Sequence, residues 1–70
     1  MAERSTLKLN GIKYEYITPL SLNELLNYLG FNRDVILIDY NGTIIQKQNW
    51  NTIKLQNQDN IEILTLAGGG

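Results

Sequence analysis

The alternation of apolar and polar residues predicts a β-hairpin at the start of the chain. Residues 6–10 and 12–16 each alternate with a period of two, and Asn10-Gly11 lies between them. Both central residues of a two-residue type I′ turn need positive φ, which Asn and Gly tolerate best. Pro19 ends the second strand because it has no N–H to donate to a sheet. The inward-facing residues of this hairpin are expected to be Leu7, Leu9, Ile12, Tyr14 and Tyr16.

A helix is predicted from Ser21 to Leu29. Ser21-Leu22-Asn23-Glu24 has the form of a capping box, in which the side chains of Ser21 and Glu24 each accept from the other residue's N–H. Leucines then recur at the spacing of one apolar helix face: Leu22, Leu25, Leu26 and Leu29. Gly30 is expected to end the helix in the left-handed conformation.

A second hairpin and a last strand are predicted in the rest of the chain. The β-branched run 35–40 is followed by a second Asn-Gly pair, Asn41-Gly42, which turns the chain back into 43–45. Residues 59–66 alternate again, with Ile61 and Ile63 facing one way and Glu62, Leu64 and Leu66 the other. Between these strands the chain is polar, and we expect Trp50, Ile53 and Leu55 to anchor it.

This order of elements predicts an α+β fold with four or five strands in a mixed sheet packed on one main helix. A single leucine stripe can be buried only against one sheet face, so both hairpins and the last strand must share that face. The arrangement is the β-grasp of ubiquitin-like proteins. Residues 1–66 are expected to form the domain, and residues 67–70 a flexible C-terminal tail.

The tail is the candidate functional segment. It reads Ala67-Gly68-Gly69-Gly70 and follows a strand directly. Glycine backbone enters channels too narrow for side chains, so the terminal carboxylate of Gly70 is the predicted reactive group and residues 67–69 the segment that a partner binds. The alternative is a loose chain end without function, which is common at termini.

Composition argues against several classes of function. The chain has 70 residues, no Cys and no His, which removes thiol nucleophiles, the usual general base and the commonest metal ligands. We therefore expect no enzyme activity and no bound cofactor or metal. A net charge of -1 argues against a nucleic-acid partner, and no apolar run approaches the about 20 residues of a membrane span. The predicted location is the cytoplasm or the plastid stroma, and the free chain is expected to be a monomer.

Four segments of the chain resemble the ThiS family of thiamine sulfur carriers. They are the helix 21–29 followed by Gly30, the hairpin 39–45, Trp50 at eight residues after Gly42, and the strand start 59–63 leading into the terminal glycines. Two positions depart from the family pattern. Gln46-Lys47 replaces a frequent Pro-Arg, and Gln58 replaces a frequent Gly, so Asn57 is expected to supply the positive φ of that turn.

The resemblance implies a carrier cycle. A ThiF-like enzyme would use ATP and magnesium to adenylate the Gly70 carboxylate, sulfur from a donor protein would replace AMP, and the thiocarboxylate would supply a ThiG-like thiazole synthase. Adenylation is needed because a carboxylate is a poor electrophile without a leaving group. Three leucines are candidates for the partner surface, as an apolar patch on the sheet face away from the helix: Leu37, Leu64 and Leu66. The alternative is a set of scattered surface leucines.

Three other functions remain open at this point. One is a sulfur carrier like the small subunit of molybdopterin synthase, which also ends in two glycines. Another is a ubiquitin-like modifier conjugated to lysines of other proteins. The third is a β-grasp interaction module whose tail has no role.

Overall fold

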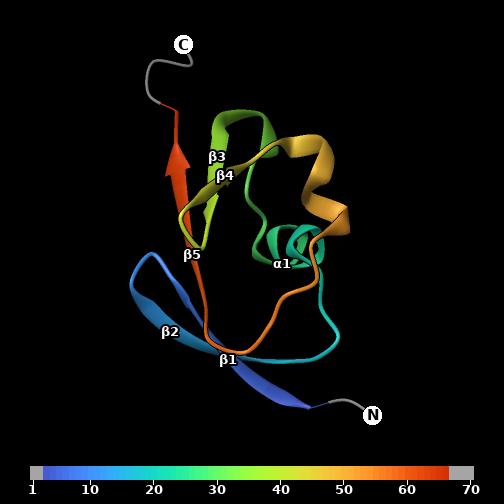
Figure 1. The fold of residues 1–70 in the computed structure, drawn as a ribbon. Helices are drawn as coiled ribbons and strands as arrows, with labels where there is room; N and C mark the ends of the chain where they lie inside the picture. The colour runs from blue at the N-terminus through green and yellow to red at the C-terminus, as the bar shows by residue number, and fades with distance from the viewer. Residues whose placement is uncertain (1–2, 67–70) are drawn as a thin grey trace.

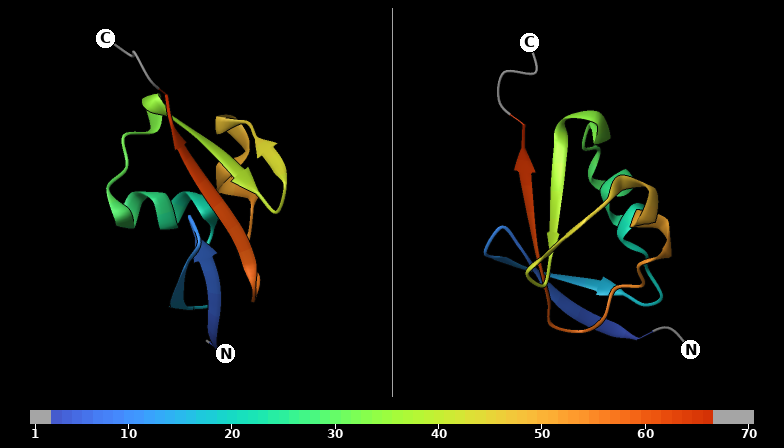
Figure 2. Two further views of the ribbon diagram at one scale, coloured as in Figure 1. Left: turned by 90° about the vertical axis from the view of Figure 1, so that its left-hand side faces the viewer. Right: turned by 45° about the horizontal axis from the view of Figure 1, so that its top comes forward.

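The computed structural model describes residues 3–66 and shows a sheet with α1 and a 3-10 segment on one side (Figures 1 and 2). The predicted domain end and flexible tail, residues 67–70, lie outside the described residues. The elements in chain order are β1 (Arg4–Leu9), β2 (Ile12–Ile17), α1 (Leu22–Leu29), η1 (Arg33–Val35), β3 (Ile36–Tyr40), β4 (Thr43–Ile45), η2 (Lys47–Thr52) and β5 (Asp59–Thr65).

The five strands lie in the order β2-β1-β5-β3-β4. β1 and β5 pair in parallel at the centre, with Leu7 opposite Asp59, and every other neighbouring pair is antiparallel. The end of β5 lies at the far end of the molecule from the start of β1 (Figure 1). The predicted α+β fold is confirmed: this is the β-grasp arrangement, with a mixed sheet of five strands.

Local hydrogen bonds fix both ends of α1, as the sequence predicts. The Glu24 N–H donates to Ser21 Oγ at 3.0 Å, and the Ser21 N–H donates to Glu24 Oε1 at 2.8 Å, which completes the capping box. Gly30 has a φ of 78°, and the N–H groups of Gly30 and Phe31 donate back to the carbonyls of Asn27 and Leu26 in a Schellman ending. The helix is therefore limited to eight residues by its own sequence.

The core lies between α1, η2 and the inner face of the sheet. η2 brings Trp50 into it, where the side chain is 2% exposed and the indole N–H donates to the Ile45 carbonyl at 3.0 Å. This confirms the predicted anchoring role of Trp50. The buried apolar residues are Leu7, Leu9, Leu22, Leu25, Leu26, Ile36, Ile38, Trp50, Leu55, Ile61 and Ile63.

The predicted inward set of the first hairpin does share one face of the sheet, but two of its members are exposed and not buried. Ile12 and Tyr14 share a face with the buried Leu7 and Leu9, but their side chains are 58% and 45% exposed. β2 is one of the two edge strands of the sheet, and the eight-residue α1 leaves the first half of β2, which carries Ile12 and Tyr14, uncovered. Alternation predicts the face of a strand correctly but gives no information on whether anything covers that face.

Two local predictions are corrected. The β3 strand begins at Ile36 and not at Val35, because Asn32 Oδ1 accepts from the Asp34 N–H and turns residues 33–35 into a 3-10 segment. In the turn before β5, Gln58 takes the positive φ, at 69°, in place of Asn57. The Asn57 side chain is used differently, since its Oδ1 accepts from the Thr6 N–H at 2.9 Å.

The two Asn-Gly turns both contact β5. Asn10 and Asn41 each have a φ of 51°, as a type I′ turn requires. Their side chains also bind the backbone of β5. Asn10 Oδ1 accepts from the Ile63 N–H and Asn41 Oδ1 accepts from the Asn60 N–H, each at 2.7 Å. The strand that leads to the C-terminus is thus held by both hairpin turns as well as by its neighbouring strands.

Candidate functional site

The last described hydrogen bond before the C-terminal segment fixes the end of β5. The Leu66 N–H donates to the Val35 carbonyl at 2.7 Å, which joins the residue after β5 to η1. The predicted reactive and partner-binding residues, Ala67, Gly68, Gly69 and Gly70, lie outside the described residues. The last position that the structure fixes before them is Leu66, through its bond to Val35.

Three leucines lie on exposed surface near this point. Leu37 of β3 and Leu64 of β5 are opposite each other in the antiparallel ladder, with 41% and 46% of their surfaces exposed, and Leu66 is 45% exposed. The buried neighbours Ile36, Ile38 and Ile63 point to the core, so Leu37 and Leu64 point away from α1. The structure brings Leu37 and Leu64 into direct cross-strand proximity beside the start of the tail.

The sequence analysis missed a fourth apolar residue on this face, Ile44. Its neighbour Ile45 pairs with the buried Ile38, so the period of two turns Ile44 to the outer face, where it is 53% exposed. The alternation within 43–45 was a sufficient signal once the pairing with β3 was known. We call Leu37, Ile44, Leu64 and Leu66 together the outer patch.

Acidic side chains border the outer patch. Asp39 and Glu62 are opposite each other on β3 and β5 and share the outer face with Leu37 and Leu64. Like charges in directly opposed positions of a sheet are destabilising. Asp39 is partly buried, and its Oδ1 accepts from the Gly42 N–H at 2.8 Å. Glu62 is the more exposed member of the pair.

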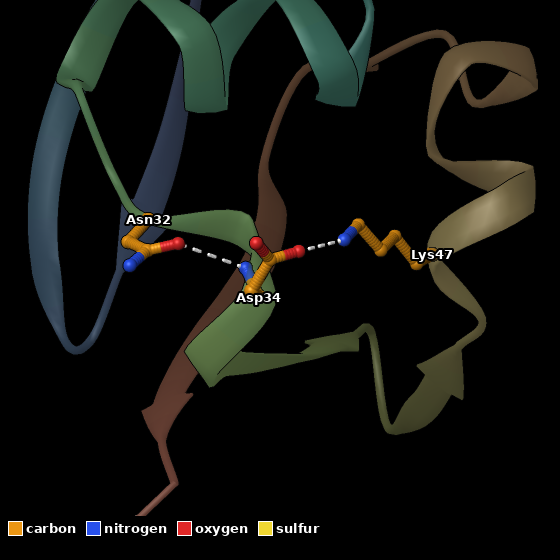
Figure 3. A network of polar contacts seen from close by, with 3 residues as sticks. All are labelled: Asn32, Asp34 and Lys47. Carbon is orange, nitrogen blue, oxygen red and sulfur yellow. Dashed lines mark hydrogen bonds and ion pairs between the residues drawn. The ribbon is translucent and has the colours of Figure 1, made fainter. Parts of the chain in front are cut away.

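An ion pair closes the corner at the end of β5 (Figure 3). The Lys47 ammonium donates to Asp34 Oδ1 and joins the start of η2 to η1, the segment whose Val35 carbonyl holds Leu66. The hydrogen bond and charge of Lys47 hold the Asp34 pKa below its usual range. Both side chains are exposed, 55% for Lys47 and 81% for Asp34, so the pair contributes little to stability.

A polar network lies at the other end of β5. Asp59 is 7% exposed, and its carboxylate accepts from the Tyr40 hydroxyl at 2.6 Å, the Asn41 side-chain amide at 3.0 Å and the Gln56 N–H at 2.7 Å. Burial, together with the hydrogen bond and charge of Asp59, raises the Tyr40 pKa well above its usual value. Three donors satisfy the carboxylate, which is what a buried structural charge needs.

Two features of residues 3–66 bear on other functions. No group of three or more Asp, Glu, His or Cys side chains in that range is arranged to hold a metal ion. None of the helices described there has the length and apolar character that a membrane span requires.

Comparisons with known proteins connect this geometry to a family. The model of the ThiS family matches residues 7–70. A protein of Trieres chinensis described as "Uncharacterized protein ycf40" is 41% identical over 73 residues, which cover 100% of both chains. A protein of Porphyra purpurea with the same description is 38% identical over 65 residues, 93% of this chain and 92% of its own.

A solved structure has the same fold. The crystal structure of the thiamine biosynthesis protein ThiS from Geobacter metallireducens superposes with a TM-score of 0.77 and covers 93% of this chain and 99% of its own. The two sequences are 23% identical, so the likeness establishes the fold. It agrees with the β-grasp topology described above.

Proposed function

The chain belongs to the ThiS family, and we propose that it is a sulfur carrier whose Gly70 carboxylate is activated and then converted to a thiocarboxylate. The observation that carries the proposal is the family match, which extends through the terminal glycines to residue 70. The β-grasp fold shared with a thiamine biosynthesis ThiS protein supports it. In this proposal the chain is a substrate of other enzymes and not itself an enzyme.

The proposed chemistry has two steps. A carboxylate oxygen of Gly70 attacks the α-phosphate of ATP bound by a ThiF-like enzyme, and pyrophosphate leaves, so that an acyl adenylate forms. In the second step, the terminal sulfur of a donor protein's persulfide attacks the acyl carbon and AMP leaves, and a thiol then cleaves the S–S bond of the resulting acyl disulfide, which releases the thiocarboxylate and forms a disulfide with the donor cysteine. ATP and magnesium belong to the activating enzyme, which also stabilises the developing negative charge.

The outer patch is the proposed docking surface for that enzyme. Its leucines lie next to the residue at which the tail begins, so a partner that binds the patch receives the tail at a fixed place. Exposed apolar clusters of this kind mark protein interaction sites. The opposed Asp39 and Glu62 carboxylates favour a basic side chain on the partner, because a cation beside them relieves their repulsion.

The proposed destination of the sulfur is the thiazole of thiamine, through a ThiG-like synthase. This finer assignment is supported by family membership and by the fold shared with the thiamine biosynthesis protein of Geobacter metallireducens. Copurification tests it: tagged full-length chain is expected to bring down an adenylating enzyme and a thiazole synthase. Recovery of a molybdopterin-synthase large subunit in place of the thiazole synthase would contradict the assignment to thiamine.

Activation itself is tested by ATP–pyrophosphate exchange with a purified ThiF-like enzyme. The full chain is expected to support exchange, and a chain that lacks Gly69 and Gly70 is expected to support none while keeping the same circular dichroism spectrum. Equal exchange with both chains would contradict activation at the terminus. Formation of stable conjugates with lysines of other proteins would instead identify a protein modifier.

For the compartment, we favour the plastid stroma over the cytoplasm. The support is the similarity to proteins of the algae Trieres chinensis and Porphyra purpurea. Detection of the chain by antibody in a purified plastid fraction is the expected result. Its recovery only in the fraction outside plastids would contradict this assignment.

A further inference from the structure

The strand β2 presents an open edge of six residues, whereas β4 at the opposite edge has only three. In a two-residue hairpin the pair that flanks the turn, here Leu9 and Ile12, is hydrogen-bonded, and bonded pairs then alternate along the ladder. This alternation makes Glu3 and Thr18 a hydrogen-bonded pair, and the Thr18 N–H does donate to the Glu3 carbonyl, at 2.7 Å. The backbone groups of Lys13, Glu15 and Ile17 consequently point away from β1.

Apolar side chains flank this open edge on both faces. On the helix side, Ile12 and Tyr14 are 58% and 45% exposed. On the same side, an open groove lies between β2 and α1, and its lining includes Tyr16, Leu25 and Tyr28. On the outer side, Ile17 is 54% exposed. Edge strands are usually blunted by short length, proline or bulges, because an open edge is a template for pairing. β2 has none of these three features, and of the charged side chains that also protect edges it has one of each sign, Lys13 and Glu15.

We infer that β2 pairs antiparallel with β2 of a second copy of this chain, with Tyr14 on the two-fold axis. The charge pattern selects both the occupant and the register. With Tyr14 at the centre, Lys13 of each copy lies opposite Glu15 of the second copy, so two attractive cross-strand pairs form at once. The two neighbouring registers are centred on Lys13 or on Glu15. They place Lys13 opposite Lys13, or Glu15 opposite Glu15, and are disfavoured because like charges then lie opposite each other.

This register also pairs the exposed apolar residues on the helix side. Tyr14 lies opposite Tyr14 of the second copy, and Ile12 lies opposite its Tyr16, which covers the surfaces that α1 leaves open. The two sheets become one continuous sheet across the axis. β5 is separated from β2 by β1, so the outer patch and the start of each tail stay accessible. The pairing replaces the monomer expected from the sequence, and it does not depend on the proposed sulfur chemistry.

Charge-reversal variants of the full chain test the register. Their association is measured by sedimentation equilibrium over a range of concentrations. The natural chain is expected to approach twice the chain mass as concentration rises. Lys13→Glu and Glu15→Lys each turn both attractive pairs into repulsive ones, so each variant alone is expected to dimerise at least tenfold more weakly. An equimolar mixture of the two variants restores both attractive pairs and is expected to recover the association of the natural chain.

Glu62→Lys is the matched control for Glu15→Lys, because it makes the same charge change at an exposed position of β5, which β1 separates from the edge strand β2. It is expected to leave association within twofold of the natural chain. Circular dichroism spectra establish that each exposed substitution leaves the fold intact. A natural chain that keeps one chain mass at its highest soluble concentration would overturn the inference, as would a mixture that associates no better than the separate variants.

Cysteine trapping tests the position of the axis in a chain that has no natural cysteine. Opposite Cα atoms in a non-hydrogen-bonded pair are about 4.5 Å apart, within the range of a disulfide. Tyr14→Cys is therefore expected to form a covalent dimer on oxidation. Ile17→Cys is the control, since the two copies of residue 17 would lie about 20 Å apart at about 3.4 Å per residue. Equal cross-linking of the two variants would contradict a pairing centred on Tyr14.

Discussion

Leu37 of β3 lies directly opposite Leu64 of β5 on the face of the sheet that points away from α1. The Leu66 N–H, two residues further along, is bonded to the Val35 carbonyl, and Val35 precedes β3 by one residue. Cross-strand pairing and this hydrogen bond thus fix Leu37, Leu64 and Leu66 to the same pair of strands. In the proposed function, a partner that binds the outer patch therefore contacts the strands that end directly before residues 67–70.

Leu64→Glu is expected to reduce activation about tenfold, measured as kcat/KM for adenylation, which corresponds to about 1.4 kcal/mol of lost interaction. The cause is a charge placed in the apolar centre of the proposed docking surface. Stability is expected to change little, because the side chain is 46% exposed in the free chain. Tyr28→Glu, at an 86% exposed position on α1, is the control and should leave adenylation unchanged. Equal rates for Leu64→Glu and the natural chain would argue against this docking surface.

Tyr40→Phe is expected to lower the free energy of unfolding by about 1.5–3 kcal/mol, because it removes a hydrogen bond to the buried Asp59 carboxylate. Urea unfolding followed by fluorescence of the single tryptophan, Trp50, measures this difference. A loss below the error of the measurement would show that solvent or a neighbouring group replaces the Tyr40 hydroxyl as donor to Asp59.

The same residue is expected to make stability fall in alkali. The Tyr40 pKa is raised in the folded chain, so folding favours the protonated hydroxyl. The resulting stabilisation is fully present below the unfolded tyrosine pKa of about 10 and is lost as the pH rises toward the folded value. Tyr40→Phe should therefore show a shallower decrease of stability above about pH 10 than the natural chain. Parallel curves would exclude Tyr40 as the source.

Lys47→Met is expected to raise the Asp34 pKa toward its usual range, because the ammonium that favours the carboxylate is removed. The measurement is an NMR titration of the Asp34 carboxyl carbon. The melting temperature should hardly change, since both side chains are exposed. An unchanged Asp34 pKa would mean that the ion pair at this corner does not persist in solution.

Trp50→Ala is expected to destabilise the chain by about 3–5 kcal/mol, the range for removing a buried aromatic side chain. It empties the space between η2 and the sheet and leaves the Ile45 carbonyl without its indole donor. Thermal unfolding followed by far-ultraviolet circular dichroism measures the effect. Trp50→Phe, which keeps most of the apolar volume, should lose less, and equal losses would contradict a packing role.

Elements with complete local signals were predicted correctly from the sequence. Ser21 and Glu24 fix the start of α1, Gly30 fixes its end, and the two Asn-Gly pairs fix both hairpins, because each feature depends on residues within one turn of the chain. Ile12 and Tyr14 were misjudged because their exposure depends on strand order and helix length. The contacts of Asp59 with Tyr40 and Asn41 also join residues distant in sequence, and no local pattern indicates them.

For the candidate site too, local patterns predicted some features, and others required the pairing of strands. The outward direction of Leu64 and Leu66 follows from alternation in the last strand, but the addition of Ile44 required the register between β3 and β4. The role of Gly70 is a prediction from the sequence and the family, since residues 67–70 lie outside the described part of the chain.

Intact-mass spectrometry of the full chain tests the central claim most directly. The chain is incubated with an adenylating enzyme of the ThiF type, ATP, magnesium and a sulfur donor. The account predicts a mass increase equal to the difference between one sulfur and one oxygen atom, located at Gly70 by fragmentation. An unchanged mass, although the same enzyme thiolates a known ThiS protein, would contradict it.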